Sequence, residues 1–182
     1  MSDGVAAHLS AADVILEFGV GGSTVMAAEM AGKTITSVET DQFWVVSSNE
    51  WFEQNTGKSK PDIIWANISQ TKAWSCPKTE KHWKDYAKYS LEIWSLEGLP
   101  DPDVVLVDGR FRAGCILSTA FQTRKPTRVL VDDYEHRPSY PAVEKTADAP
   151  RLIGRMAEFE ITLTPIPARH LLEIITPMQD PY

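Results

Sequence analysis

Short apolar runs alternate with longer amphipathic stretches along most of the chain. The apolar runs predict five strands, at residues 14–18, 34–39, 62–68, 104–107 and 128–131. The amphipathic stretches predict helices at residues 23–31, from about 42 to 54, 90–97 and 112–123. Alternation of this kind predicts a three-layer α/β/α sandwich built on a mostly parallel sheet.

The pattern changes after the fifth apolar run. Residues 156–163 and 170–176 are both strand-like, and Pro165-Ile166-Pro167 lies between them, which predicts an antiparallel hairpin. We therefore expect a seven-stranded sheet that ends in this hairpin. A length of 182 residues fits one domain, which we expect to span 1–182.

A glycine-rich turn follows the first predicted strand. The strand ends with an acidic residue, Glu17, and the turn carries Gly19, Gly21 and Gly22 before a helix opens at Ser23. Glycines let the backbone turn sharply and approach a ligand closely, and a helix start presents unpaired N–H groups. The segment therefore predicts a cradle for a nucleotide-like ligand. Glu17 would repel a dinucleotide phosphate but would tolerate a positively charged amino group.

Two known motifs can be compared with this turn. The dinucleotide fingerprint G-x-G-x-x-G would require a third glycine where Thr24 stands. The pattern E/D-x-G-x-G is complete in Glu17, Gly19 and Gly21, and it resembles motif I of the class I S-adenosylmethionine-dependent methyltransferases. The resemblance implies that the turn wraps the methionine part of the cofactor, with Glu17 orienting the turn or the amino group. An NAD-dependent oxidoreductase and an α/β domain without ligand are the alternatives.

Two further strand ends extend the resemblance. Glu39 closes the second strand 20 residues after Gly19, followed by Thr40, and the resemblance implies that it holds the ribose hydroxyls. Asn67 and Ile68 close the third strand, where the family usually has an Asp that bonds the adenine amine. Asn67 can accept that bond through its carbonyl oxygen.

The fourth strand is followed by Asp108-Gly109-Arg110-Phe111-Arg112. The resemblance places Asp108 near the sulfonium, and a carboxylate attracts a cation there. The guanidinium groups of Arg110 and Arg112 can clamp a carboxylate or phosphate. Solvated salt bridges with the acidic surface are the alternative for both arginines, and capping of the next helix is the alternative for Asp108.

The fifth strand is followed by Asp132 and Asp133, for which two interpretations compete. In metal-dependent catechol-type O-methyltransferases, similar positions hold Mg²⁺, and Asp108, Asp132 and Asp133 would supply oxygen ligands. However, Asp133 stands where that group has Asn, and no lysine base can be matched. The other interpretation makes His136 a general base, because histidine takes a proton near neutral pH. A structural or solvent-facing histidine is the alternative.

Residues 69–86 interrupt the alternation on the ligand side of the sheet. Loops of this length are often lids or binding loops, and Trp74 and Trp83 could close over a substrate. The alternative is a helical connection whose tryptophans pack on the sheet.

Composition narrows the classes of partner and compartment. A net charge of −7 disfavours broad attraction to nucleic acid or to an anionic membrane. No apolar run approaches the roughly 18 residues of a membrane span. Cys76 and Cys115 are too few for a disulfide framework. We therefore expect a cytoplasmic protein.

These features predict methyl transfer from S-adenosylmethionine to an oxygen or nitrogen of a small, anionic molecule. Asp108, Arg110 and His136 are the candidate catalytic residues. The chain looks like small bacterial methyltransferase-like proteins, and family habit makes a homodimer plausible. No Asn-Pro-Pro-Tyr-type motif follows the fourth strand, which disfavours methylation of a nucleic-acid base. A binding module that holds the cofactor without catalysing transfer is the alternative function.

Overall fold

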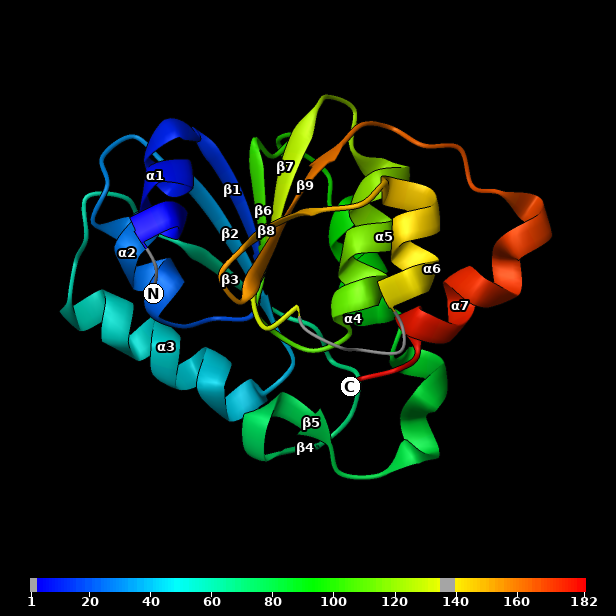
Figure 1. Ribbon diagram of the computed structural model, residues 1–182. Coiled ribbons are helices and arrows are strands. Elements are labelled where there is room, and N and C mark those ends of the chain that lie inside the picture. The colour runs from blue at the N-terminus through cyan, green and yellow to red at the C-terminus, as the bar shows by residue number, and fades with distance from the viewer. Residues whose placement is uncertain (1–2, 135–139) are drawn as a thin grey trace.

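A seven-stranded sheet forms the centre of the protein in the computed structural model, which describes residues 3–134 and 140–182 (Figure 1). In chain order its strands are β1 (Val14–Phe18), β2 (Thr34–Glu39), β3 (Asp62–Trp65), β6 (Val104–Val107), β7 (Thr127–Val131), β8 (Arg151–Ile153) and β9 (Met156–Ile161). Across the sheet the order is β3-β2-β1-β6-β7-β9-β8. All neighbouring pairs are parallel except β7–β9 and β8–β9. The predicted fold class, a mostly parallel sheet with an antiparallel terminal hairpin, is confirmed.

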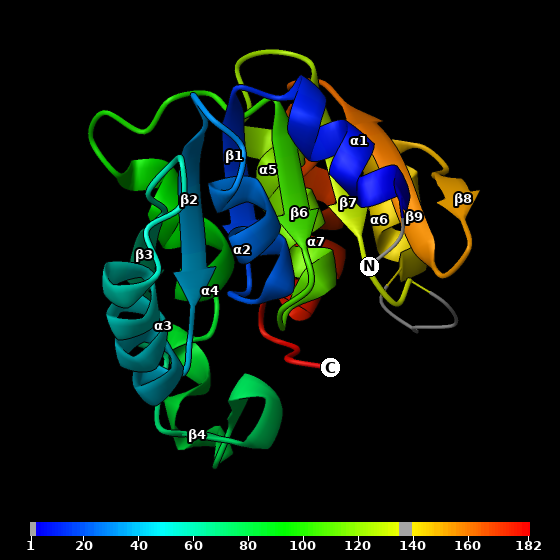
Figure 2. The same cartoon turned by 90° about the vertical axis from the view of Figure 1, so that its left-hand side faces the viewer.

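Helices cover both faces of the sheet (Figures 1 and 2). One face carries α1 (Asp3–Ala11), α2 (Gly22–Ala28) and α3 (Gln42–Gln54). The other carries α4 (Lys88–Leu91), the short 3-10 helix η3 (Glu92–Ser95), α5 (Arg112–Gln122), α6 (Tyr140–Ala147) and α7 (Leu171–Met178). None of the helices in the described residues is long and apolar enough to cross a membrane.

An apolar cluster is buried on each face of the sheet, and the strands contribute apolar side chains to both clusters. Every residue of β6 is apolar and at most 4% exposed, as expected for a central parallel strand covered on both faces. The larger cluster packs β6 and β7 against α5, and the smaller packs the opposite side of the sheet against α1 and α2.

The segment between β3 and α4 projects beyond the carboxyl ends of the strands (Figures 1 and 2). It contains a small antiparallel hairpin, β4 (Thr71–Lys72) and β5 (Cys76–Pro77), joined by the 3-10 turn η1 (Ala73–Ser75). A second 3-10 helix, η2 (Glu80–Asp85), follows. The sequence predicted a loop here, and the hairpin gives that loop a defined shape.

The topology brings four loops together. The chain moves outward in one direction from β1 through β2 to β3, and in the other direction from β6 to β7, so the strand order switches between β1 and β6. Ligands in open parallel sheets bind outside the carboxyl ends of the strands at such a switch. The loops after β1, β2, β6 and β7 all lie at this edge.

The prediction for the residues of the terminal hairpin was wrong. Residues 170–176 belong mainly to helix α7, and the strand that forms the terminal hairpin with β9 is β8. Leu171, Ile174 and Met178 recur at helical spacing, and Ile174 and Met178 are buried in the larger apolar cluster. Gly154 has a φ of +62°, which suits the two-residue turn that joins β8 to β9.

Several predicted boundaries also differ from the structure. Strand β3 ends at Trp65, three residues before the predicted end, and α2 ends at Ala28 rather than Ala31. The predicted helix at 90–97 is the end of α4 followed by η3. The predicted cap of α3 is present, because the Asp41 carboxylate accepts a hydrogen bond from the Trp44 N–H at 3.0 Å.

Adjacent isoleucines on α7 test the docking of this helix. Ile174 is 6% exposed and Ile175 is 46% exposed. We expect Ile174→Ala to lower the free energy of unfolding by about 2–4 kcal/mol through lost burial and a cavity. Ile175→Ala should change it by less than about 0.5 kcal/mol. Urea denaturation measures both variants, and equal small effects would contradict the docking of α7 against the core.

Candidate functional site

A cavity of about 880 Å³ opens at the switch in strand order. Its walls come from the turn after β1, the end of β2 with the first turn of α3, the β4–β5 hairpin, the loops after β6 and β7, and the β8–β9 turn. A volume of this size can enclose a small-molecule ligand. This cavity is the candidate site, and most of the predicted site residues lie on its wall or directly behind it.

Close backbone packing shapes the glycine turn. Gly19 has a φ of +109°, and a Cβ atom built there would lie 2.9 Å from the backbone nitrogen of Gly109. The Phe18 carbonyl accepts hydrogen bonds from the N–H groups of Asp108 and Gly109, at 3.0 and 2.8 Å. Gly21 also lines the cavity, but its backbone is extended, and a Cβ atom built there would have no neighbour within 4 Å. Gly19 therefore serves the fold, and Gly21 leaves space for a ligand.

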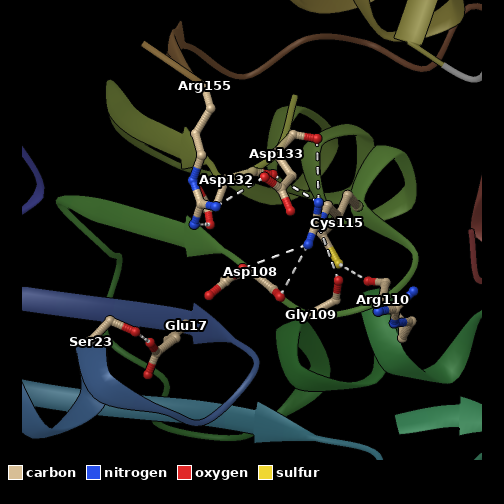
Figure 3. Close-up of polar contacts among 10 residues, drawn as sticks. Glu17, Ser23, Asp108, Gly109, Arg110, Cys115, Asp132, Asp133 and Arg155 are labelled. Carbon is tan, nitrogen blue, oxygen red and sulfur yellow. Dashed lines mark hydrogen bonds and ion pairs between the residues drawn. The ribbon is translucent and has the colours of Figure 1, made fainter. Parts of the chain in front are cut away.

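Glu17 lies behind the turn rather than on the cavity wall. Its carboxylate is buried and accepts a hydrogen bond from the hydroxyl of Ser23 (Figure 3). It also accepts hydrogen bonds from the hydroxyl of Thr24 and from Ser37 Oγ, the latter at 2.9 Å. These bonds tie the start of α2 to β1 and β2. Of the two roles that the resemblance implied, orienting the turn is the one that this geometry supports.

The environment of Glu17 favours its neutral form. Burial raises the pKa of Glu17 from its usual 4.5 to about 7, and the negative charge of Asp108 acts in the same direction. The hydrogen bonds from the three hydroxyls lower the pKa and only partly offset the burial. The glycine turn is thus held by a carboxyl group that titrates near neutral pH.

Glu39 stands on the cavity wall at the end of β2. Its Oε1 accepts hydrogen bonds from the backbone N–H groups of Thr40 and Asp41, at 2.6 and 2.9 Å. Within the described residues, its Oε2 accepts a single long hydrogen bond, from the Val20 N–H at 3.4 Å. The carboxylate is therefore fixed by one oxygen, and the other can accept a hydrogen bond from a ligand hydroxyl. Thr40 is buried, and its hydroxyl donates to the Ser75 carbonyl at 3.1 Å.

The structure does not bring Asn67 and Ile68 to the cavity wall. Asn67 is exposed, Ile68 is buried in the larger apolar cluster, and β3 has already ended at Trp65. Residues from η1 and the start of α3, including Trp44 and Trp74, form this side of the cavity instead. Contact of Asn67 with an adenine amine stays a prediction.

The two arginines after β6 have different surroundings (Figure 3). Arg112 is buried, and its guanidinium donates to the carbonyls of Gly109 and Asp132, at 3.1 and 2.9 Å. It therefore links the loops after β6 and β7, and it is neither a free anion clamp nor a solvated surface charge. The Arg110 guanidinium makes no hydrogen bond or ion pair with any side chain or backbone group in residues 3–134 and 140–182. This guanidinium lines the cavity and is available to pair with an anionic ligand.

Asp108 faces the same cavity as Arg110. Half of its side chain is exposed, and its Oδ1 lies 3.6 Å from Arg112 Nη2. Partial burial and the charge of Asp132 raise the pKa of Asp108, while the charges of Arg112 and Arg155 counteract this. One wall of the cavity therefore combines a carboxylate of raised proton affinity with a free guanidinium.

Arg155 pairs with two of the three carboxylates that the metal interpretation needs. Its Nη2 lies 2.5 Å from Asp132 Oδ2, and its Nη1 lies 3.3 Å from Asp133 Oδ1. A Mg²⁺ ion at these carboxylates would have to displace the guanidinium. Within the described part of the chain, no group of three or more His, Cys, Asp or Glu side chains is arranged to hold a metal ion. The geometry gives no support to Mg²⁺ binding by Asp108, Asp132 and Asp133.

His136 lies outside the described residues, so its role as a base stays a prediction.

Two residues of the cavity wall, Arg155 and Trp44, were not predicted from the sequence. Trp44 Nε1 donates to the Val20 carbonyl at 2.8 Å and braces the glycine turn. The Gly154-Arg155 pair between two short apolar runs is a hairpin signal that could have placed Arg155 at this edge of the sheet.

Trp74 projects at the mouth of the cavity. Its side chain is 84% exposed, and Trp74 and Ser75 have φ values of +63° and +56°. The alternative in which both tryptophans of this segment pack on the sheet is wrong for Trp74. The hairpin instead holds an aromatic ring beside the opening, as the lid hypothesis requires.

A pH titration of stability tests the buried state of Glu17. The pKa of Glu17 is higher in the folded state than in the unfolded state. The protonated side chain therefore contributes fully to the free energy of unfolding below pH 4.5, and this contribution is lost as the pH rises to about 7. We expect the wild type to lose roughly 3 kcal/mol relative to Glu17→Gln across that window. Urea denaturation at each pH gives the difference, and parallel curves for the two proteins would contradict the burial of this carboxyl.

Comparisons with known proteins agree with the topology. No protein-family model and no curated protein matches the chain. Among solved structures, it is similar to a methyltransferase-like protein from Silicibacter pomeroyi DSS-3, with 42% identity, a TM-score of 0.94, and coverage of 98% of this chain and 93% of that one.

More distant structures share the fold. An O-methyltransferase from Bacillus cereus in complex with SAH, the S-adenosylhomocysteine product, is 14% identical, with a TM-score of 0.57 and coverage of 88% and 82%. An SAH-bound methyltransferase from Podospora anserina is 15% identical, with a TM-score of 0.58 and coverage of 89% and 80%. With 42% identity to a methyltransferase-like protein over nearly the whole length of both, and with the strand order and glycine turn described above, this chain belongs to the class I S-adenosylmethionine-dependent methyltransferase family.

Proposed function

We propose that the protein transfers a methyl group from S-adenosylmethionine to an oxygen or nitrogen of a small, anionic molecule. The observation that carries the proposal is the joint placement of the glycine turn after β1 and the Glu39 carboxylate after β2 on one cavity. The SAH bound to the Bacillus and Podospora proteins supports the same cofactor here. We propose a cytoplasmic enzyme acting on a small molecule rather than on nucleic acid, and a homodimer as its assembly.

The described residues fit this cofactor at two points. The empty space beside Gly21, together with Gly22 and Ser23 at the start of α2, would hold the methionine part of S-adenosylmethionine. The Oε2 of Glu39, which accepts a single long hydrogen bond from the Val20 N–H, would accept hydrogen bonds from the ribose hydroxyls. When bound, the cofactor supplies a sulfonium methyl group, which an acceptor lone pair takes in line as the carbon–sulfur bond breaks.

The chain contributes positioning and proton transfer. Holding the acceptor in line with the methyl group converts a bimolecular step into an effectively unimolecular one. We assign proton removal from the acceptor to Asp108, whose raised pKa makes it a better base than an ordinary Asp. We assign Arg110 to an oxyanion of the acceptor, because its guanidinium has no other partner in the described residues. His136 is the second candidate for the base.

Calorimetric titration of SAH into two glycine variants tests the cradle. Gly21→Val adds a side chain where no atom lies within 4 Å, so the variant should fold normally and lose SAH binding. Gly19→Val meets the Gly109 backbone at positive φ, so it should lose about 2 kcal/mol or more of stability. NAD titrated into the wild type is the ligand control, and added Mg²⁺ tests metal dependence. SAH binding retained by folded Gly21→Val would refute the cradle.

Release of SAH in the presence of candidate acceptors tests the catalytic assignments. With an accepted substrate, Arg110→Ala should raise KM at least tenfold, the effect of removing a charge-assisted hydrogen bond of about 1.5–3 kcal/mol, while SAH affinity stays unchanged. Arg110→Lys should recover part of that loss. An unchanged KM in Arg110→Ala would remove Arg110 from the acceptor site.

A pair of variants separates the two candidate bases. We expect Asp108→Asn to lower kcat by roughly 100-fold or more, the usual contribution of a general base. His136→Ala is the counterpart, and a larger loss in this variant would transfer the assignment to His136. Binding of SAH without turnover of any acceptor would favour the inactive binding module.

A further inference from the structure

A second hollow, of about 550 Å³, lies beside the candidate active site. One wall is the segment from β5 through η2, and the other is the end of α7 with residues 179–182. Lys72 of β4 lines both this hollow and the main cavity, so the two spaces meet at this side chain. The hollow therefore adjoins the site in which the reaction is proposed to occur.

Aromatic rings and prolines form part of the walls of the hollow. Trp83, Tyr86 and Tyr182 contribute aromatic rings, and Pro77 and Pro181 add two further flat faces. Tyr86 is buried, and its hydroxyl donates to the Thr79 carbonyl at 2.9 Å, which fixes the ring in place. The rings of Trp83 and Tyr182 are exposed, so another planar ring can stack or pack edge to face against them.

The charged groups of the hollow leave two ammonium groups available. Lys72 and Lys78 are exposed, and neither forms a hydrogen bond or ion pair through its side chain with any residue that the structure describes. The acids are Glu80 and Asp180, and Asp180 Oδ1 already accepts the Tyr182 N–H at 3.0 Å. A carboxylate of a ligand in the hollow can therefore pair with Lys78 and Lys72.

We propose that this hollow is an acceptor-recognition subsite for a planar aromatic group that carries a carboxylate. The ring would pack against the exposed side chains of Trp83 and Tyr182, with the carboxylate at Lys78 and Lys72. The inference rests on the proposed function, because it takes the hollow beside the main cavity to be part of the site that recognises the methyl acceptor. It also gives the projecting segment a role in substrate choice.

Binding of aromatic acids to the SAH-saturated protein tests the proposal. The probes are 4-hydroxycinnamate and 4-hydroxybenzoate, with their neutral amides as ligand controls, measured by calorimetry and by ligand-observed NMR. Lys78→Gln should weaken binding of the acids roughly three- to fivefold, the effect of one exposed ion pair. Lys81→Gln is the matched control, because Lys81 is exposed on η2 and lines neither space. Trp83→Ala should weaken binding of acids and amides alike, by about tenfold.

The outcomes separate this inference from the proposed function. If SAH binds but neither acid does, or if Lys78→Gln and Lys81→Gln bind the acids equally, the subsite is overturned and the proposed function stands. If SAH does not bind, the proposed function fails. The same acids and variants then test the hollow without SAH, and a selective loss in Lys78→Gln would still establish an aromatic-acid site.

Discussion

The close backbone approach between the loops after β1 and β6 is the constraint on which the rest of the site depends. Gly19 and Gly109 pack so tightly that neither has room for a side chain: a Cβ atom on Gly109 would lie 2.1 Å from the Tyr89 hydroxyl. The Phe18 carbonyl accepts hydrogen bonds from both N–H groups at the start of the β6 loop. The first turn and Asp108 are therefore held at a fixed separation before any ligand arrives.

Two further cross-links extend this rigidity to the neighbouring loops. The Glu17 carboxylate joins hydroxyl groups from α2 and β2, and the Arg112 guanidinium joins backbone carbonyls after β6 and β7. Both groups are buried, so they hold the loops in place behind the cavity. A site organised in this way loses less entropy on binding, since its loops are already ordered.

The ion pairs in the cavity determine which charged groups remain available to bind a ligand. Arg155 neutralises Asp132 and Asp133, which favours an arginine-bridged wall over a metal centre. Among the described residues, the Arg110 guanidinium has no partner, and one oxygen of Glu39 accepts only a long hydrogen bond from the Val20 N–H. The cavity thus offers an acceptor of hydroxyl hydrogen bonds at the end of β2 and a donor to oxyanions after β6.

Much of this arrangement could be predicted from sequence, and the failures have physical causes. The buried strands, the glycine turn and Glu39 depend on local spacing, so their positions followed from the pattern. The role of Arg112 could not be predicted, because its carbonyl partner at Asp132 lies 20 residues away and carries no side-chain signal. Residues 170–176 were misassigned because an apolar run next to prolines is ambiguous between strand and helix.

A crystal structure of the protein with SAH tests the central claim most directly. We predict the amino-acid part of SAH against Gly21, and a ribose hydroxyl at about 2.5–3.0 Å from Oε2 of Glu39. SAH bound elsewhere, or bound in this cavity without contact to Glu39 and the glycine turn, would contradict the account.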